Sequence, residues 1–168
     1  RFVDMFIREG KLAVILDHSA IVKTIEIGRI DGRYFIAMEY IGGKDLTQVL
    51  RRCQEENKRI PVPHAVFIAA KIAEGLHYAH TFRRSDGSQL KIVHRDISPS
   101  NVLLSDMGLV KLLDFGIARM SGDEGSTFKT ERPRVRGKLP YLPLEMFKGE
   151  EPTERSDSYS LGVVLYEM

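Results

Sequence analysis

A single dipeptide, Asp31-Gly32, constrains the fold more than any other feature of the sequence. It separates two apolar, β-rich runs, residues 21–30 and 33–40. An Asp-Gly pair in this setting is typical of a two-residue hairpin turn, because both turn positions need positive φ angles. The sequence therefore predicts an antiparallel hairpin, and Gly42-Gly43 is expected to end its second strand.

Helical patterns dominate the rest of the chain. Apolar residues recur at three- and four-residue steps from His64 to His80, which predicts a helix with one buried face. Further helices are expected over residues 2–17, from 45 to about 57, and from 156 onward. The remaining predictions are a surface turn at 85–88, short β-like runs at 92–93, 102–104 and 110–113, and a long polar loop at 121–138. A small β-rich start followed by a helical body predicts an α+β fold.

The composition narrows the functional classes. The 168 residues, 43% of them hydrophobic, fit one compact domain or part of one. A net charge of +2 does not favour a polyanion-binding surface, so no nucleic-acid partner is expected. Cys53 is the single cysteine, which excludes an internal disulfide and favours a reducing, cytoplasmic location. The apolar runs are far shorter than the roughly 18 residues of a membrane span, so no membrane contact is expected from this segment.

Three oxygen-bearing side chains follow one another at short spacing: Asp96, Asn101 and Asp114. One carboxylate can accept the proton of a hydroxyl nucleophile. A second carboxylate and a carboxamide can hold Mg²⁺ against substrate phosphates, because this hard cation prefers oxygen ligands. The three residues therefore indicate phosphoryl-transfer chemistry.

The motifs around these residues resemble those of eukaryotic-type protein kinases. "HRD" at 94–96 with Asn101 precedes "DFG" at 114–116, and "IAMEYIGG" at 36–43 is similar to the hinge between kinase lobes. "YLPLE" at 141–145 and "SDSYSLGVVLYEM" at the end are similar to the close of an activation segment and the helix after it. The resemblance implies a protein-kinase-like fold that uses ATP and Mg²⁺, in which residues 1–40 belong to the small lobe and 41–168 to the helical lobe.

The resemblance also implies roles for individual residues. Asp96 would be the catalytic base, and Asn101 and Asp114 the Mg²⁺ ligands. His94 and Phe115 would be packing residues, and Asp157 would accept hydrogen bonds from the backbone of the catalytic loop. The nucleotide would be bound by Glu9, which pairs with an ATP-binding lysine, by the hinge residues Glu39, Tyr40 and Ile41, by Asp45 at the ribose, and by Leu103. For Glu9 and Asp45, a solvated charge on a helix is the alternative.

Two positions depart from the kinase pattern. Ser98 stands where serine/threonine kinases place a lysine, and Lys138 stands where they place a threonine. We predict that the two side chains have exchanged places, so that Lys138 supplies the charge near the phosphates and Ser98 steadies it, both as catalytic residues. The alternative is that Lys138 is one more cation in the basic stretch 129–138.

The sequence as a whole predicts a bacterial-type serine/threonine protein kinase that phosphorylates protein substrates. It is expected to phosphorylate itself within residues 121–130, with Thr130 the first candidate and Ser126 and Thr127 the lesser ones. The alternatives are a pseudokinase acting as a nucleotide-binding regulatory module and a small-molecule phosphotransferase of similar fold. The sequence begins and ends inside helical patterns, without the glycine-rich loop and strand lysine of kinases. It is therefore interpreted as an internal segment, from helix C to helix F, that has no activity by itself.

Overall fold

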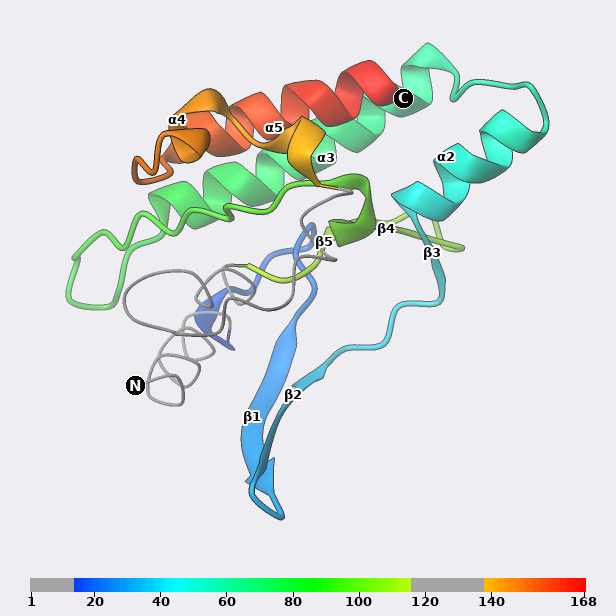
Figure 1. The fold of residues 1–168 in the computed structure, drawn as a ribbon. Coiled ribbons are helices and arrows are strands. Elements are labelled where there is room, and N and C mark those ends of the chain that lie inside the picture. Colours follow the sequence, from blue (N-terminus) through cyan, green and yellow to red (C-terminus); the bar gives the residue numbers. More distant parts are fainter. Residues whose placement is uncertain (1–13, 116–137) are drawn as a thin grey trace.

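The computed structural model describes residues 14–115 and 138–168, and it combines small antiparallel sheets with a helical body (Figure 1). The strands are β1 (Thr24–Ile30), β2 (Arg33–Met38), β3 (Gly43–Asp45), β4 (Val102–Ser105) and β5 (Val110–Leu112). The helices are α2 (Leu46–Glu55), α3 (Val62–Thr81), α4 (Leu144–Phe147) and α5 (Glu154–Glu167), with 3₁₀ turns at Pro99–Asn101 and Leu139–Tyr141. The predicted α+β composition is confirmed.

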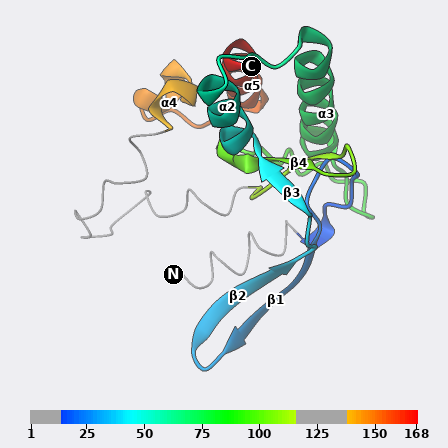
Figure 2. The ribbon, with the colours of Figure 1, turned by 90° about the vertical axis from the view of Figure 1, so that its right-hand side faces the viewer.

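The predicted hairpin is present as β1 and β2, which pair antiparallel with Ile27 opposite Ile36. Asp31 and Gly32 form the turn with φ angles of 49° and 79°, the positive values that this turn needs. Figure 2 shows the hairpin extending away from the helices. The segment that follows β2 leads into the second sheet and the helical body.

The second sheet has the order β3-β4-β5, with all pairs antiparallel. Its register places Asp45 opposite Leu103 and Leu103 opposite Lys111, so these residues form one row across three strands. Gly42-Gly43 was predicted only to end a strand, whereas Gly43 also begins β3. This sheet matters for function because β4 follows the loop that carries Asp96 and Asn101, and β5 precedes Asp114.

Gly43 is the position where the sheet tolerates no side chain. Its φ angle is +154°, and a Cβ atom there would lie 2.2 Å from the carbonyl oxygen of Leu104. We expect Gly43→Ala to lower the free energy of unfolding by about 1–3 kcal/mol, measured by urea denaturation. The matched control is Gly162→Ala in α5, where a Cβ would meet nothing within 4 Å and the substitution should be neutral or stabilising by up to about 1 kcal/mol. Equal effects of the two substitutions would contradict the steric explanation.

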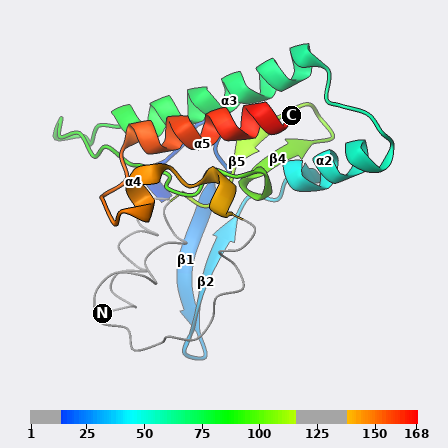
Figure 3. The same cartoon turned by 45° about the horizontal axis from the view of Figure 1, so that its top comes forward.

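The helices α2, α3 and α5 begin and end close to the predicted positions, whereas the short α4 was not predicted. Asp45 caps α2 by accepting a hydrogen bond from the backbone of Gln48 at 2.9 Å. Thr153 and Ser156 form a capping box at the start of α5. In α3, the predicted apolar face is the buried one, and Figure 3 shows α3 and α5 lying side by side. For the helix predicted over residues 2–17, the structure describes only its end, at Val14 and Ile15.

The strand-like run Ile92-Val93 was predicted wrongly, because these residues are irregular in the structure. The backbone N–H of Ile92 donates to the carbonyl of Ala79 at the end of α3, at 3.2 Å. The side chain of Ile92 is buried in the core. Packing against a helix end therefore satisfies this apolar pair without a partner strand.

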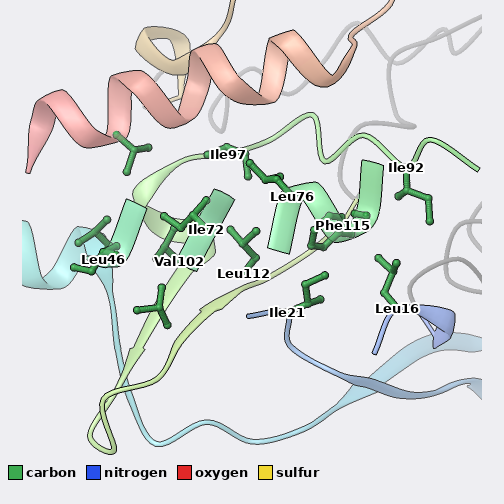
Figure 4. Close-up of a cluster of buried hydrophobic side chains, with 14 residues drawn as sticks. Leu16, Ile21, Leu46, Ile72, Leu76, Ile92, Ile97, Val102, Leu112 and Phe115 are labelled. Atoms are coloured by element: carbon green, nitrogen blue, oxygen red, sulfur yellow. The ribbon is translucent and has the colours of Figure 1, made fainter. Parts of the chain in front are cut away.

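One apolar core joins the second sheet to α3 and continues toward the hairpin (Figure 4). Its members include Leu16, Ile21, Leu46, Ile72, Leu76, Ile97, Val102, Leu112 and Phe115. Ile97 and Phe115 flank the candidate catalytic groups, so burial of these two side chains helps to fix the loops that bear them. Among the described residues, no helix has both the length and the apolar character needed to cross a membrane.

Candidate active site

The loop that begins at His94 is held in place by the buried carboxylate of Asp157 in α5. Oδ2 of Asp157 accepts a hydrogen bond from the backbone N–H of His94, and Oδ1 accepts one from Arg95, both at 2.8 Å. His80 Nε2 in α3 lies 2.8 Å from Oδ2. Asp157 is only 1% exposed, so these contacts replace the water that a buried carboxylate loses. The predicted support role of Asp157 is confirmed.

Asp96 and Asn101 are joined directly. Nδ2 of Asn101 donates to the backbone carbonyl of Asp96 at 2.8 Å and to its side-chain Oδ2 at 3.0 Å. The 3₁₀ turn at Pro99–Asn101 makes this return of the chain possible. Since the amide nitrogen is used in both bonds, Oδ1 of Asn101 is the atom left for a metal ligand.

Asp114 is brought to the same place by the chain after β5. The backbone N–H of Leu113 donates to the carbonyl of Asn101 at 2.9 Å, and the carbonyl of Leu113 lies 2.8 Å from His94 Nε2. Asp114 follows with a φ angle of 56°, a left-handed conformation that turns the chain at this point. The structure thus gathers all three oxygen-bearing residues around one loop.

The donor set fits Mg²⁺. Asn101 and Asp114 offer one carbonyl oxygen and one carboxylate, and Mg²⁺ commonly takes one or two protein oxygens and completes its shell with water and substrate phosphates. In residues 14–115 and 138–168, no three His, Cys, Asp or Glu side chains come together as an all-protein metal cage. A metal ion shared with a phosphorylated ligand is what these oxygens could hold.

His94 and Phe115 pack against each other, as predicted. Their ring centroids are 4.6 Å apart, with an angle of 57° between the planes. Burial lowers the pKa of His94, although the nearby carboxylates of Asp157, Asp96 and Asp114 act in the opposite direction. Because burial opposes protonation of this ring, His94 suits the predicted packing role.

The described residues that were predicted to bind the nucleotide lie between β2 and β3, in β3 and in β4. Glu39 follows β2, and its carboxylate pairs with Lys111 and accepts a hydrogen bond from the backbone of Lys23 at 2.8 Å. Tyr40 is 93% exposed, and Ile41 is half-buried. Asp45 and Leu103 are neighbours in the cross-strand row, and the carboxylate of Asp45 caps α2. Glu9 and Thr130 lie outside the described residues.

Glu39 and Lys111 form an ion pair that sequence reasoning missed. Lys111 is buried in β5, and its Nζ reaches Glu39 and the carbonyl of Ile21. Burial alone would raise the pKa of Glu39, but its hydrogen bonds with Lys111 and Lys23, together with their charges, lower it overall. The signal in the sequence is a lysine inside the apolar strand VKLL, a charge that needs a buried partner.

The lowered pKa of Glu39 predicts a pH-dependent contribution to stability. The contribution is fully present above the ordinary carboxyl pKa of 4.5 and is lost as the pH falls through the lower pKa of the folded state. We therefore expect Glu39→Gln to reduce the free energy of unfolding by about 1 kcal/mol at pH 7, and the difference from wild type to shrink in acid. Urea denaturation from pH 7 down to below the ordinary carboxyl pKa of 4.5 checks this difference. Lys111→Met is the control, because it removes the cation that pairs with Glu39. A difference that stays constant with pH would contradict it.

Lys138 and Ser98 occupy different surroundings. Nζ of Lys138 lies 2.5 Å from Oδ2 of Asp96, so the structure brings this predicted cation to the predicted base. Ser98 is 2% exposed, and its hydroxyl lies 3.1 Å from that of Ser100. In the described part of the chain, Lys138 is therefore hydrogen-bonded to Asp96 and not to Ser98.

The sequence matches the protein kinase domain family over residues 3–168. The chain belongs to the protein kinase family. Protein kinases in general use ATP and Mg²⁺ and act on protein substrates, and their bacterial members are well represented among the similar proteins. The predicted kinase fold is confirmed.

The similar proteins include both serine/threonine kinases and a tyrosine kinase. Tyrosine-protein kinase MasK of Myxococcus xanthus is 42% identical over 166 residues, which are 99% of this chain and 25% of that protein. Serine/threonine-protein kinase PrkC of Bacillus subtilis is 36% identical over 167 residues, 99% of this chain and 24% of that protein. The crystal structure of the Mycobacterium tuberculosis PknI kinase domain is 29% identical, with a TM-score of 0.70, and it matches 98% of this chain and 55% of its own. This kinase segment thus spans about a quarter of its curated relatives.

Proposed function

We propose that this kinase transfers the γ-phosphoryl group of Mg-ATP to serine and threonine residues of protein substrates, as part of a bacterial-type signalling system. The observation that supports the proposal is the hydrogen bond between Asn101 and Asp96, together with the backbone bond from Leu113 to Asn101 that brings the neighbouring Asp114 close to this loop. A pseudokinase would not need this combination.

Each residue has a distinct task in the proposed reaction. Asp96 orients the substrate hydroxyl and accepts its proton as the new oxygen–phosphorus bond forms and the bond to the ADP oxygen breaks. Asn101 holds Asp96 in position through its amide nitrogen, and its Oδ1 would be the ligand for the metal ion. Mg²⁺, when bound, offsets the charge of the phosphate oxygens. Asp157 keeps the loop in the geometry that these tasks require.

The nucleotide's base and ribose are proposed to lie along the cross-strand row. The backbone of Glu39, Tyr40 and Ile41 would contact adenine, Leu103 would form an apolar surface beneath it, and Asp45 would face the ribose. Because Asp45 already caps α2 through Oδ1, a ribose hydroxyl would share a carboxylate that has a structural role. A cytoplasmic site of action is proposed with this function, because ATP is the phosphate donor and Cys53 has no second cysteine with which to form a disulfide within the chain.

Tyrosine phosphorylation is the second candidate, because MasK is named a tyrosine kinase and Ser98 replaces a lysine typical of serine/threonine kinases. The test is transfer from radiolabelled Mg-ATP to generic protein substrates by the full-length protein, followed by phosphoamino-acid analysis. Phosphoserine and phosphothreonine are expected. Phosphotyrosine alone would favour the second candidate, and nucleotide binding with no transfer would favour the pseudokinase.

A further inference from the structure

We propose that Lys138 is a catalytic residue that supplies the cation for the transferred phosphoryl group, in place of a charge within the loop of Asp96. The inference rests on the proposed phosphotransfer function. It says which residue supplies the positive charge that the loop of Asp96 lacks. From Asp96 to Asn101 the loop reads DISPSN and contains no lysine or arginine. The loop itself therefore supplies no cation to offset the negative charge that Asp96 brings close to the γ-phosphoryl group.

The first argument is proximity to the base. Nζ of Lys138 and Nδ2 of Asn101 both bond to the same oxygen, Oδ2 of Asp96, at 2.5 and 3.0 Å. A hydroxyl bound by Asp96 has to lie within hydrogen-bond distance of this carboxylate, and its phosphorus target about 3–3.5 Å further on. The phosphoryl oxygens would therefore come within reach of the lysine ammonium.

The second argument is accessibility. The side chain of Lys138 is 34% exposed and that of Asp96 is 15% exposed, so the pair lies at the edge of the site and not in the core. An ion pair this exposed contributes little to stability. A half-exposed lysine can turn from the carboxylate toward a phosphate without leaving a buried charge unpaired.

The third argument is that both partners are fixed to one helix. Asp157 of α5 holds the backbone at Arg95, next to Asp96. Ser160 of α5 donates to the carbonyl of Tyr141 at 2.7 Å, in the 3₁₀ turn that begins directly after Lys138. The backbone segments that carry the cation and the base are thus held by a common support.

Several hydrogen bonds hold the turn after Lys138 and the segment that follows it. Within the turn, the N–H of Tyr141 donates to the carbonyl of Lys138 at 3.1 Å. The hydroxyl of Tyr141 donates to Glu167, and Ser156 donates to Glu145 at 2.8 Å. These contacts hold the turn that directly follows Lys138.

Ser98 has a different part from the one predicted. Its hydroxyl is buried against Ser100, so it does not steady Lys138. Two small side chains here leave the space beside Asp96 to the ammonium of Lys138. The positive charge is therefore carried by Lys138 instead of position 98, but Lys138 and Ser98 do not bond to each other.

The first experiment measures binding in the full-length protein by calorimetry. Lys138→Met is expected to weaken a non-hydrolysable Mg-ATP analogue at least about tenfold and to leave Mg-ADP unchanged, because only the analogue carries a γ-phosphate. The matched control is Lys148→Met, an exposed lysine after α4, which should alter neither affinity. If Lys138→Met changes both nucleotides equally, or neither, the proposal is overturned.

The second experiment measures turnover. Lys138→Met should lower kcat by about 10²- to 10³-fold, the usual effect of losing one preorganised charge donor, with little change in the KM for the protein substrate. Lys138→Thr with Ser98→Lys should recover at least tenfold over Lys138→Thr alone, since the cation returns from another position. Unchanged turnover in Lys138→Met would overturn the inference even in an active kinase. If wild type transfers no phosphate, the proposed function fails, while the nucleotide comparison still decides the role of Lys138.

Discussion

Replacing Asp157 by Ala is expected to lower the free energy of unfolding by about 3–5 kcal/mol, the largest stability effect we foresee in this chain. The substitution would leave the N–H groups of His94 and Arg95 without their acceptor, and His80 without its carboxylate partner. Unsatisfied groups in a buried position lose their hydrogen bonds to water without any replacement. Phosphate transfer should be abolished as well, because Asp96 follows directly after the released backbone.

Chemical denaturation of wild type and variant measures the first effect, and a transfer assay at a temperature where both remain folded measures the second. The matched control is Ser158→Ala, an exposed neighbour on α5 whose hydroxyl donates to the carbonyl of Glu154 in its own helix, at 3.0 Å. It should change stability by less than about 0.5 kcal/mol. A loss below about 1 kcal/mol in Asp157→Ala would show that the loop has other sufficient supports.

Asp96→Asn is expected to have the largest effect on catalysis, lowering kcat by about 10²- to 10⁴-fold. An amide has nearly the shape of the carboxylate but cannot accept a proton from the substrate hydroxyl. The hydrogen bond from Asn101 to the backbone carbonyl of Asp96 would remain, so the loop should keep its shape. Mg-ADP affinity should therefore be close to that of wild type.

Steady-state kinetics and nucleotide titration of the full-length protein check this expectation together. The control is Asp106→Asn, a carboxylate in the exposed turn between β4 and β5, which should leave kcat within about twofold of wild type. Turnover of Asp96→Asn within tenfold of wild type would mean that Asp96 is not the proton acceptor. A parallel loss of Mg-ADP binding would instead indicate a misfolded loop.

Local patterns in the sequence predicted those parts of the fold that neighbours along the chain determine. The Asp31-Gly32 hairpin and the buried face of α3 depend on turn chemistry and on helical spacing, which can be read from a few adjacent residues. β3 could not be predicted in this way, since Gly43-Lys44-Asp45 has no strand preference and owes its conformation to pairing with β4. Ile92-Val93 failed for the same reason, because distant contacts outweigh local preference.

The candidate site divides along the same line. Asp96, Asn101 and Asp114 were identified from their oxygen atoms and their motifs, and the structure shows Asn101 bonded both to Asp96 and to the residue before Asp114. The pairs that were missed join residues far apart in sequence, Glu39 with Lys111 and His80 with Asp157. The contact of Lys138 with Asp96 could be expected from their opposite charges. The contact of Ser98 with Ser100 depends on how the loop packs, which the charges of the residues do not determine.

The attachment of both sides of the site to α5 has a consequence for local unfolding. Segments that rest on separate supports open independently, each with its own free energy. Here the backbone next to Asp96 depends on Asp157, and the turn after Lys138 depends on Ser160, which lies on the same helix. A fluctuation that frays α5 between these two residues therefore releases the base and the cation in one event, while the β1–β2 hairpin keeps its own hydrogen bonds.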